Sequence, residues 1–181
     1  MNRFIRILLL AAGVSLAAGC STMTSPRTPD LSTVSSLDVD RYLGRWHVIA
    51  YTPNFMERGK VATADIYARR PDGKLDAIYV FRKGSLDAPE QEWRGVAKIV
   101  DADTNAEWKV QLLWPFWADY LVLELDPDYR WAVVASRGGK WLWILARETG
   151  LPPATYADLV ERIAARGLDA AKLERVPQRT D

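Results

Sequence analysis

Between Gly44 and Arg147 the sequence alternates short β-rich segments with short links, and this regular spacing limits the possible folds. We predict eight strands, near residues 44–52, 62–70, 74–82, 92–100, 107–114, 120–125, 130–136 and 141–147. The links, such as 71–73 and 137–139, are rich in Gly, Pro and Asp, which favour tight turns. Links this short join antiparallel neighbours, because a parallel crossover needs about a dozen residues or more. The pattern therefore predicts an all-β, up-and-down antiparallel architecture.

Several predicted strands alternate apolar and polar residues, as expected for a sheet with one buried face. In segment 107–114, for example, Trp108, Val110 and Leu112 alternate with charged or polar residues. Eight such strands can close into a barrel whose interior is filled by side chains or holds one small ligand. Closure also removes the two edges that an open sheet would expose.

After Arg147 the pattern becomes helical. Pro152 and Pro153 suit the start of a helix, and Gly167 suits the position just after its end. We predict one helix over residues 153–166. Its apolar residues at helical spacing are expected to pack on the outside of the barrel; they are Tyr156, Leu159, Val160 and Ile163.

The first 19 residues have the pattern of an export signal. Arg3 and Arg6 precede the apolar run 7–16, and the small residues Ala17, Ala18 and Gly19 follow it. The apolar run is too short to span a membrane as a stable helix. We therefore predict a signal peptide over residues 1–19 and exclude it from the fold. Its removal leaves a nearly neutral domain.

Cys20 directly follows these small residues, in a pattern that resembles a bacterial lipobox, although Ala17 stands where the lipobox usually has Leu. This resemblance implies that Cys20 is acylated, and Ser21 after it implies sorting to the outer membrane. Several acyl chains hold a protein stably on a membrane. Residues 20–36, rich in Ser, Thr and Pro, are predicted to be the acylated Cys and a flexible tether. We therefore expect a lipid-anchored protein on the periplasmic face of the bacterial outer membrane.

Composition excludes several classes of function. The 24 Lys and Arg residues and 23 Asp and Glu residues leave a net charge of only +1, which argues against nucleic-acid binding. With one Cys and one His, His47, the chain can form neither an internal disulfide nor a Cys- or His-rich metal site. We expect no metal and no cofactor. The eight Trp, seven Tyr and four Phe residues favour an aromatic-lined interior.

Three motifs at defined places in this pattern resemble those of a known family. Gly44-Arg45-Trp46 opens the first predicted strand, an Asp126-Pro127-Asp128-Tyr129 turn precedes the seventh, and Trp143-Ile144-Leu145-Ala146-Arg147 closes the eighth. Together with the following helix, residues 37–177 resemble a bacterial lipocalin of the outer-membrane lipoprotein type. The resemblance implies that Trp46 plugs the closed end of the barrel, that Arg147 lies across its ring and that Gly44 permits a tight entry. A guanidinium on an indole is a favourable cation–π pair.

The same parity selects residues that face the interior. If Arg147 points inward, the two-residue period of a strand also turns Leu145, Trp143 and Trp141 inward, and Trp46 selects Val48 and Ala50. By their apolar faces the other ligand-binding candidates are Tyr79, Trp108 and Val110, with Leu75, Ala77, Phe81 and Leu112 beside them. In segment 62–70 two interpretations remain: plain alternation turns Ala62, Ala64, Ile66 and Ala68 inward, whereas a bulge would turn Tyr67 inward.

The resemblance implies a lipocalin that binds fatty acids or lysophospholipids and stores or transports lipid at the outer membrane, with a homodimer possible. Arg82, Lys83 or Arg94 near the open end could screen an anionic head group. The aromatic segment 114–120 could line the mouth, form a dimer contact or touch the membrane. One alternative is a lipocalin-fold enzyme, although no G-x-S-x-G motif is present and we name no catalytic residue. The other alternative is a structural envelope protein whose barrel is filled by its own side chains.

Overall fold

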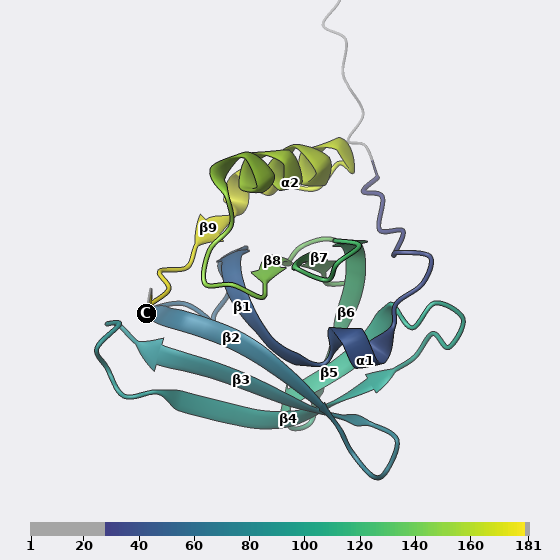
Figure 1. Ribbon diagram of the computed structural model, residues 1–181, viewed down its shortest axis with the longest axis horizontal. Helices are drawn as coiled ribbons and strands as arrows, with labels where there is room; N and C mark the ends of the chain where they lie inside the picture. The colour runs from purple at the N-terminus through teal and green to yellow at the C-terminus, as the bar shows by residue number, and fades with distance from the viewer. Residues whose placement is uncertain (1–27, 180–181) are drawn as a thin grey trace, which may run out of the picture.

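The computed structural model describes residues 28–179, which form a closed antiparallel β-barrel (Figure 1). Each strand pairs with the next, and β1 pairs with both β8 and β2, so the sheet closes on itself. The barrel strands are β1 (Gly44–Tyr51), β2 (Lys60–Arg69), β3 (Leu75–Lys83), β4 (Gln91–Ile99), β5 (Glu107–Leu113), β6 (Phe116–Leu125), β7 (Trp131–Ala135) and β8 (Leu142–Ala146). The predicted eight-stranded up-and-down barrel is confirmed. The predicted signal peptide 1–19, the predicted lipidation site Cys20 and the start of the predicted tether lie outside the described residues.

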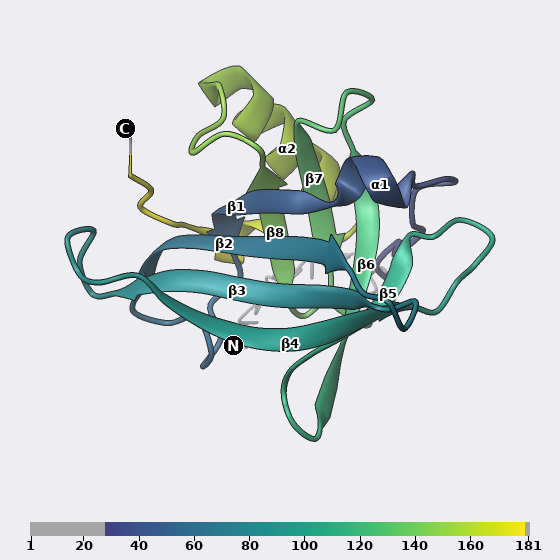
Figure 2. The same ribbon diagram turned by 60° about the horizontal axis from the view of Figure 1, so that its bottom comes forward.

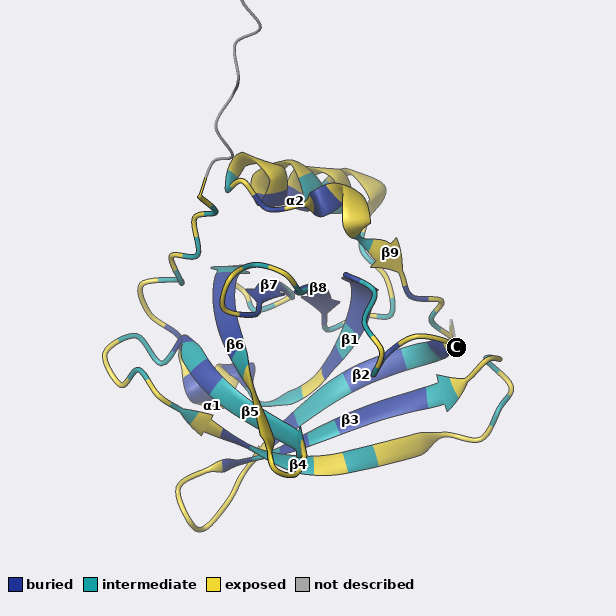
Figure 3. Ribbon diagram, turned by 180° about the vertical axis from the view of Figure 1, so that it is seen from behind, coloured by how far each residue is buried: buried dark blue, intermediate teal, exposed yellow. Residues whose placement is uncertain are grey.

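Helix α2 (Pro153–Ala165) packs against the outside of the barrel, as expected. Its buried residues Leu159 and Ile163 join a cluster with outward-facing side chains of β6, β7 and β8. The face of α2 toward the barrel is therefore buried while its other face is exposed (Figure 3). Gly167 has a φ of 76° just after the helix, which a glycine adopts without strain. Within residues 28–179 no helix is long and apolar enough to cross a membrane.

The remaining elements are short. Helix α1 (Val39–Tyr42) precedes β1, and Asp38 caps it by accepting hydrogen bonds from the backbone N–H groups of residues 40 and 41. After α2, the 3-10 helix η1 (Ala170–Lys172) leads into β9 (Glu174–Arg175), which pairs with the end of β1. Figure 2 shows β1, β2, β3 and β4 running side by side across the front of the barrel.

Part of the predicted tether is held against the barrel. The backbone N–H of Asp30 donates to the carbonyl of Arg166, and that of Val34 donates to the carbonyl of Val122. Leu31 packs against the buried cluster under α2. The segment 28–36 therefore differs from the expected flexible tether, because its few apolar side chains and backbone groups find partners on the barrel.

Two bulges decide which side chains of β1 and β2 face the interior. In β1 the pairing with β8 shifts between Val48 and Ala50, so that Val48 stays inside while Ala50 joins the cluster under α2. The expectation that Ala50 faces inward is therefore wrong, because a bulge inserts one residue and reverses the alternation after it. Tyr51 takes the inward place instead.

The second bulge lies in β2, where the pairing with β3 shifts between Val61 and Ala64 and Ala62 has a φ of 47°. Beyond it, Tyr67 pairs with Ala77 and is buried in the barrel core. The interpretation with a bulge is the one observed. The alternative, with the inward set Ala62, Ala64, Ile66 and Ala68, is wrong.

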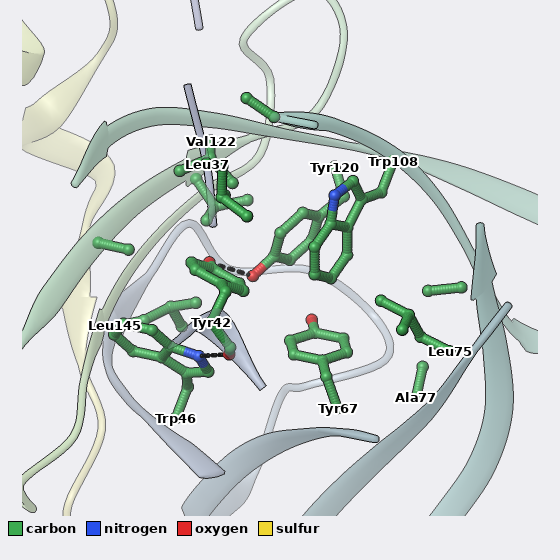
Figure 4. Close-up of a cluster of buried hydrophobic side chains, with 14 of the residues drawn as sticks. Leu37, Tyr42, Trp46, Tyr67, Leu75, Ala77, Trp108, Tyr120, Val122 and Leu145 are labelled. Atoms are coloured by element: carbon green, nitrogen blue, oxygen red, sulfur yellow. Dashed lines mark hydrogen bonds between the residues drawn. The ribbon is translucent and has the colours of Figure 1, made fainter. Parts of the chain in front are cut away.

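Five aromatic side chains fill the half of the barrel next to α1; we call Tyr42, Trp46, Tyr67, Trp108 and Tyr120 the aromatic layer. Figure 4 shows their rings turned toward one another, with ring-centroid distances of 4.7 to 6.2 Å between the neighbouring pairs. The polar atoms in the layer are also satisfied. The hydroxyls of Tyr42 and Tyr120 are 2.8 Å apart, and the indole N–H of Trp46 donates to the carbonyl of Tyr42 at 2.8 Å. This end of the barrel is therefore packed solid.

Arg147 packs against the aromatic layer and stabilises it. Its guanidinium lies 3.8 Å from the centroid of the Trp46 ring and donates to the backbone carbonyls of Arg41 at 2.7 Å and Arg45 at 2.8 Å. Gly44 has a φ of 91°, and a Cβ there would lie 3.5 Å from the Arg147 guanidinium. This is the arrangement that the resemblance implies for Gly44, Trp46 and Arg147. It connects the first strand with the last.

Replacement of Arg147 by Met should lower the free energy of unfolding by about 2–4 kcal/mol, because a cation–π contact and charge-assisted hydrogen bonds are lost together. Urea unfolding followed by circular dichroism measures the change. Arg58→Met is the matched control, since Arg58 is exposed, and a change within about 0.5 kcal/mol is expected there. Equal changes in the free energy of unfolding for the two substitutions would contradict the stabilising role of Arg147.

Candidate functional site

The other half of the barrel contains a cavity of about 120 Å³. It lies between the aromatic layer and the open end, where the β1–β2, β5–β6 and β7–β8 links meet. Tyr67 and Tyr120 of the aromatic layer form its floor. Its other lining residues are Asn54, Phe55, Met56, Glu57, Asp65, Tyr79, Val110, Leu112, Ala118, Asp119, Trp141 and Trp143. The barrel is thus half filled and half hollow.

The structure divides the predicted ligand-binding residues into three groups. Trp141, Trp143, Tyr79, Val110 and Tyr67 line the cavity. Trp108, Val48 and Leu145 are fully buried in the core cluster and do not line it. Ala50 lies outside the interior, under α2.

The sequence reasoning missed the rim of the cavity. Residues 54–57 belong to the β1–β2 link, which showed no strand pattern, yet they form one side of the mouth. The strand predicted to start at residue 120 begins at Phe116, so most of the aromatic segment 114–120 belongs to β6. Within this segment, Ala118, Asp119 and Tyr120 line the cavity, whereas Trp114, Phe116 and Trp117 are exposed. The aromatic residues Phe116, Trp117 and Tyr120, which favour β-strands, were the signal that could have extended this strand.

Glu57 is a buried carboxylate at the rim, with 9% of its surface exposed. The indole N–H of Trp143 donates to its two carboxylate oxygens at 3.0 and 3.1 Å, and the amide of Asn54 donates to it as well. Burial raises the pKa of Glu57, and these donors and the charge of Lys60 oppose that rise. Glu57 therefore fixes the rim segment to β8 through Trp143.

Asp65 is one of three acidic residues that line the cavity, beside Glu57 at the rim and Asp119, which pairs with Lys109 at 2.6 Å. Asp65 follows the β2 bulge, which places it opposite Tyr79 of β3 and turns it inward. Burial, together with the negative charge of Glu57, raises the pKa of Asp65 from 3.8 to about 8. At pH 7 this carboxyl is mostly protonated, so the cavity presents a neutral hydrogen-bonding group rather than a charge.

Lys60 is the basic group at the mouth. Its side chain is 9% exposed, and its ammonium lies over the rings of Trp93, Phe81 and Tyr79 at 3.3, 3.9 and 4.8 Å from the ring centroids. Burial lowers the pKa of Lys60 to about 8. The sequence pattern does not single out Lys60, because Lys60 is the first residue of β2 and precedes the predicted strand 62–70.

None of the three basic residues selected from the sequence for a head group lines the cavity itself. Arg82 binds the β3–β4 link through the carbonyl of Ala88 and the carboxylate of Glu90. Arg94 pairs with its neighbour Glu92 at 2.6 Å. Lys83 is exposed and stands opposite Lys60 in the register of β2 and β3.

No cluster of metal-binding side chains is assembled in the described part of the chain. Within residues 28–179 no group of three or more His, Cys, Asp or Glu side chains could hold a metal ion. Glu124, an acidic residue of β6, points outward and accepts hydrogen bonds from Arg166 at 2.8 and 2.9 Å. The cavity therefore offers apolar walls and a polar mouth, which is the chemistry of binding.

Comparison with known proteins identifies the family of this barrel. A family model described as a lipocalin-like domain matches residues 37–178. The chain therefore belongs to the lipocalins. Membership of this family, together with the cavity, indicates that the protein binds small hydrophobic ligands.

Individual relatives narrow the type to a Blc-like bacterial lipocalin. The chain is 31% identical over 179 residues to the outer membrane lipoprotein Blc of Escherichia coli, an alignment that covers 97% of this chain and 98% of that protein. It is 33% identical over 158 residues to temperature-induced lipocalin-1 of Arabidopsis thaliana, covering 82% and 83%. Among solved structures, insecticyanin from the tobacco hornworm Manduca sexta has the same fold, with a TM-score of 0.66, 19% identity and coverage of 84% and 87%.

The raised pKa of Asp65 predicts a pH-dependent stability. Between pH 4 and pH 8 the folded protein holds a proton that the unfolded chain releases, so this group's contribution to stability is lost as pH rises toward 8. Asp65→Asn should remove this loss. The free energy of unfolding of the variant, relative to that of the unsubstituted protein, should rise by about 1.4 kcal/mol or more between pH 5 and pH 8, because one pKa unit corresponds to that energy.

Chemical unfolding at the two pH values measures this difference. Asp103→Asn is the control, since Asp103 is exposed on the β4–β5 link. The control should show the same stability difference at both pH values. An Asp65→Asn variant that behaves like the control would show that Asp65 is ionised at neutral pH.

Proposed function

We propose that this lipocalin binds a single-chain amphiphile, a fatty acid or a lysophospholipid, with its tail in the cavity and its head group at the mouth. The observation that carries the proposal is the change in polarity along the cavity, from apolar walls in the interior to ionisable groups at the mouth. The cavity begins on the packed aromatic layer, continues between Val110, Leu112 and Trp141, and ends at the ionisable groups of the mouth. Apolar surface placed on such walls gains roughly 25 cal/mol per Å².

The size of the cavity favours a narrow ligand. A space of about 120 Å³ is comparable to the roughly 150 Å³ that accommodates benzene, and smaller than the roughly 300–1,000 Å³ of sites for drug-sized molecules. Only the terminal part of an acyl chain therefore fits in the cavity, and the rest of the chain extends through the mouth. Residues 54–57 of the rim must shift to admit the rest of it, at the cost of the contact between Glu57 and Trp143.

The ionisable groups suit a head group that stays at the mouth. Asp65 is mostly neutral at pH 7, so the deep part of the cavity carries little charge against an apolar tail. Lys60 and Lys83 stand opposite each other at the open end and can pair with a carboxylate or phosphate there.

We further propose that the protein works at the periplasmic face of the outer membrane, anchored by acyl chains on Cys20. Two observations support this location: the lipobox-like sequence before Cys20 and the similarity to proteins named outer membrane lipoproteins. A barrel held at a membrane can store lipid or carry it between the membrane and other acceptors. A homodimer stays a prediction.

Leu112 and Leu113 provide a matched pair for a binding test. Leu112 lines the cavity, whereas its neighbour Leu113 is 40% exposed and does not. Leu112→Glu should lower the affinity for a fatty acid or lysophospholipid at least tenfold, because it places a charge against the tail. Leu113→Glu should leave the affinity within twofold.

Isothermal titration with oleate and with an oleoyl lysophospholipid measures both variants, and circular dichroism verifies that they are folded. Equal affinities of the two variants would place the ligand outside this cavity. A folded protein that binds neither lipid would favour the structural, filled-barrel alternative, for which the packed aromatic layer is the supporting observation.

A further inference from the structure

Lys60 occupies an aromatic cage formed by Tyr79, Phe81 and Trp93. The three rings lie within 5.9 Å of one another, centroid to centroid, and surround one cationic nitrogen at 3.3 to 4.8 Å. All three face the interior at the open end: Tyr79 pairs with Trp93 in the register of β3 and β4, and Phe81 follows on the same face. Such a set of π-faces around one point attracts a cation.

The primary ammonium of Lys60 is chemically a poor match for this cage. It carries three N–H donors, and in the described structure its nitrogen is buried without a hydrogen-bond partner. A buried donor that makes no hydrogen bond costs free energy because it has lost its water. The lowered pKa of Lys60 agrees with this cost. A quaternary ammonium has no N–H donor, so it gains the attraction of the rings without that cost.

The cage and the cavity adjoin at one residue, Tyr79. Tyr79 belongs to both, since its ring faces the Lys60 ammonium and also lines the cavity. A single amphiphile can therefore place its tail in the cavity and its head in the cage. Lys60 is the first residue of β2, directly after the β1–β2 link, so its side chain can turn out to solvent and vacate the cage together with its aliphatic stem.

We infer that the cage formed by Tyr79, Phe81 and Trp93 binds the trimethylammonium group of a choline-type amphiphile, and that Lys60 holds this place until the head group displaces it. The inference rests on the proposed binding of single-chain lipids and adds the head group that they carry. In a phosphocholine lipid the phosphate lies beside the quaternary nitrogen, where Lys83, which stands opposite Lys60, can pair with it.

The test compares two lipids that differ only in methylation of the head-group nitrogen. Lysophosphatidylcholine and lysophosphatidylethanolamine with the same lauroyl chain are titrated calorimetrically below their micelle concentrations. We expect the choline lipid to bind at least tenfold more tightly. Its methyl protons should also shift upfield in the proton NMR spectrum of the complex, because they lie over ring faces. Equal affinities and an unshifted methyl signal would overturn the cage but not the proposed function, whereas failure of both lipids to bind would overturn both.

Two variants distinguish the contribution of the cage to head-group preference from that of aromatic residues outside it. Trp93→Leu removes the ring nearest to the cation and should reduce the preference for the choline lipid to within threefold while ethanolamine-lipid binding persists. Trp117→Leu is the control, since Trp117 is an exposed aromatic residue that contacts Lys98 outside the cage, and it should leave the preference unchanged. A preference that survives Trp93→Leu would overturn the assignment.

Lys60→Ala provides a test that leaves all three rings in place. It removes the competing cation, so the affinity for the choline lipid should rise at least threefold and more than that for the ethanolamine lipid. An unchanged or lower affinity for the choline lipid would show that Lys60 does not occupy the binding place of the head group.

Discussion

The stack of Arg147 on Trp46 holds the two ends of the sheet together. Trp46 belongs to β1 and Arg147 follows β8, so their contact at 3.8 Å and the hydrogen bonds of Arg147 to the carbonyls of Arg41 and Arg45 join the first strand to the last. The same contact supports the aromatic layer, because Trp46 packs on Tyr42 and Tyr42 on Trp108. One end of the barrel is thereby sealed, and any ligand must enter from the other end.

The open half differs from the sealed half in chemistry as well as in packing. The polar groups of the sealed half are hydrogen-bonded to one another, as in the pair Tyr42 and Tyr120. The open half contains Glu57, Asp65 and Lys60, whose pKa values burial shifts toward the neutral forms. Buried ionisable groups of this kind are costly in a structural core and are typical of sites that meet a ligand. The contrast supports the proposal that the ligand binds in the open half of the barrel.

The architecture could be predicted because the spacing of the strands, the turns and the start of the helix each depend on a short stretch of consecutive residues. The eight strands and helix 153–166 were predicted within a few residues, apart from β6, which begins at Phe116. Within β1, side-chain orientation was predicted only up to the bulge: Val48 faces inward as expected, but Ala50 does not. A bulge is a property of two paired strands, and the pairing is not visible in one segment. Lys60 and Glu57 were missed for a related reason, since their burial depends on Trp93 and Trp143 in distant strands.

The central claim is that the hollow half of this barrel holds the tail of a single-chain lipid. Native mass spectrometry of the purified protein, followed by denaturing extraction and identification of whatever is released, tests it most directly. The account predicts one lipid with a single acyl chain per barrel, present after purification or taken up when such a lipid is added. A folded barrel that carries no lipid and takes up neither fatty acids nor lysophospholipids would contradict it.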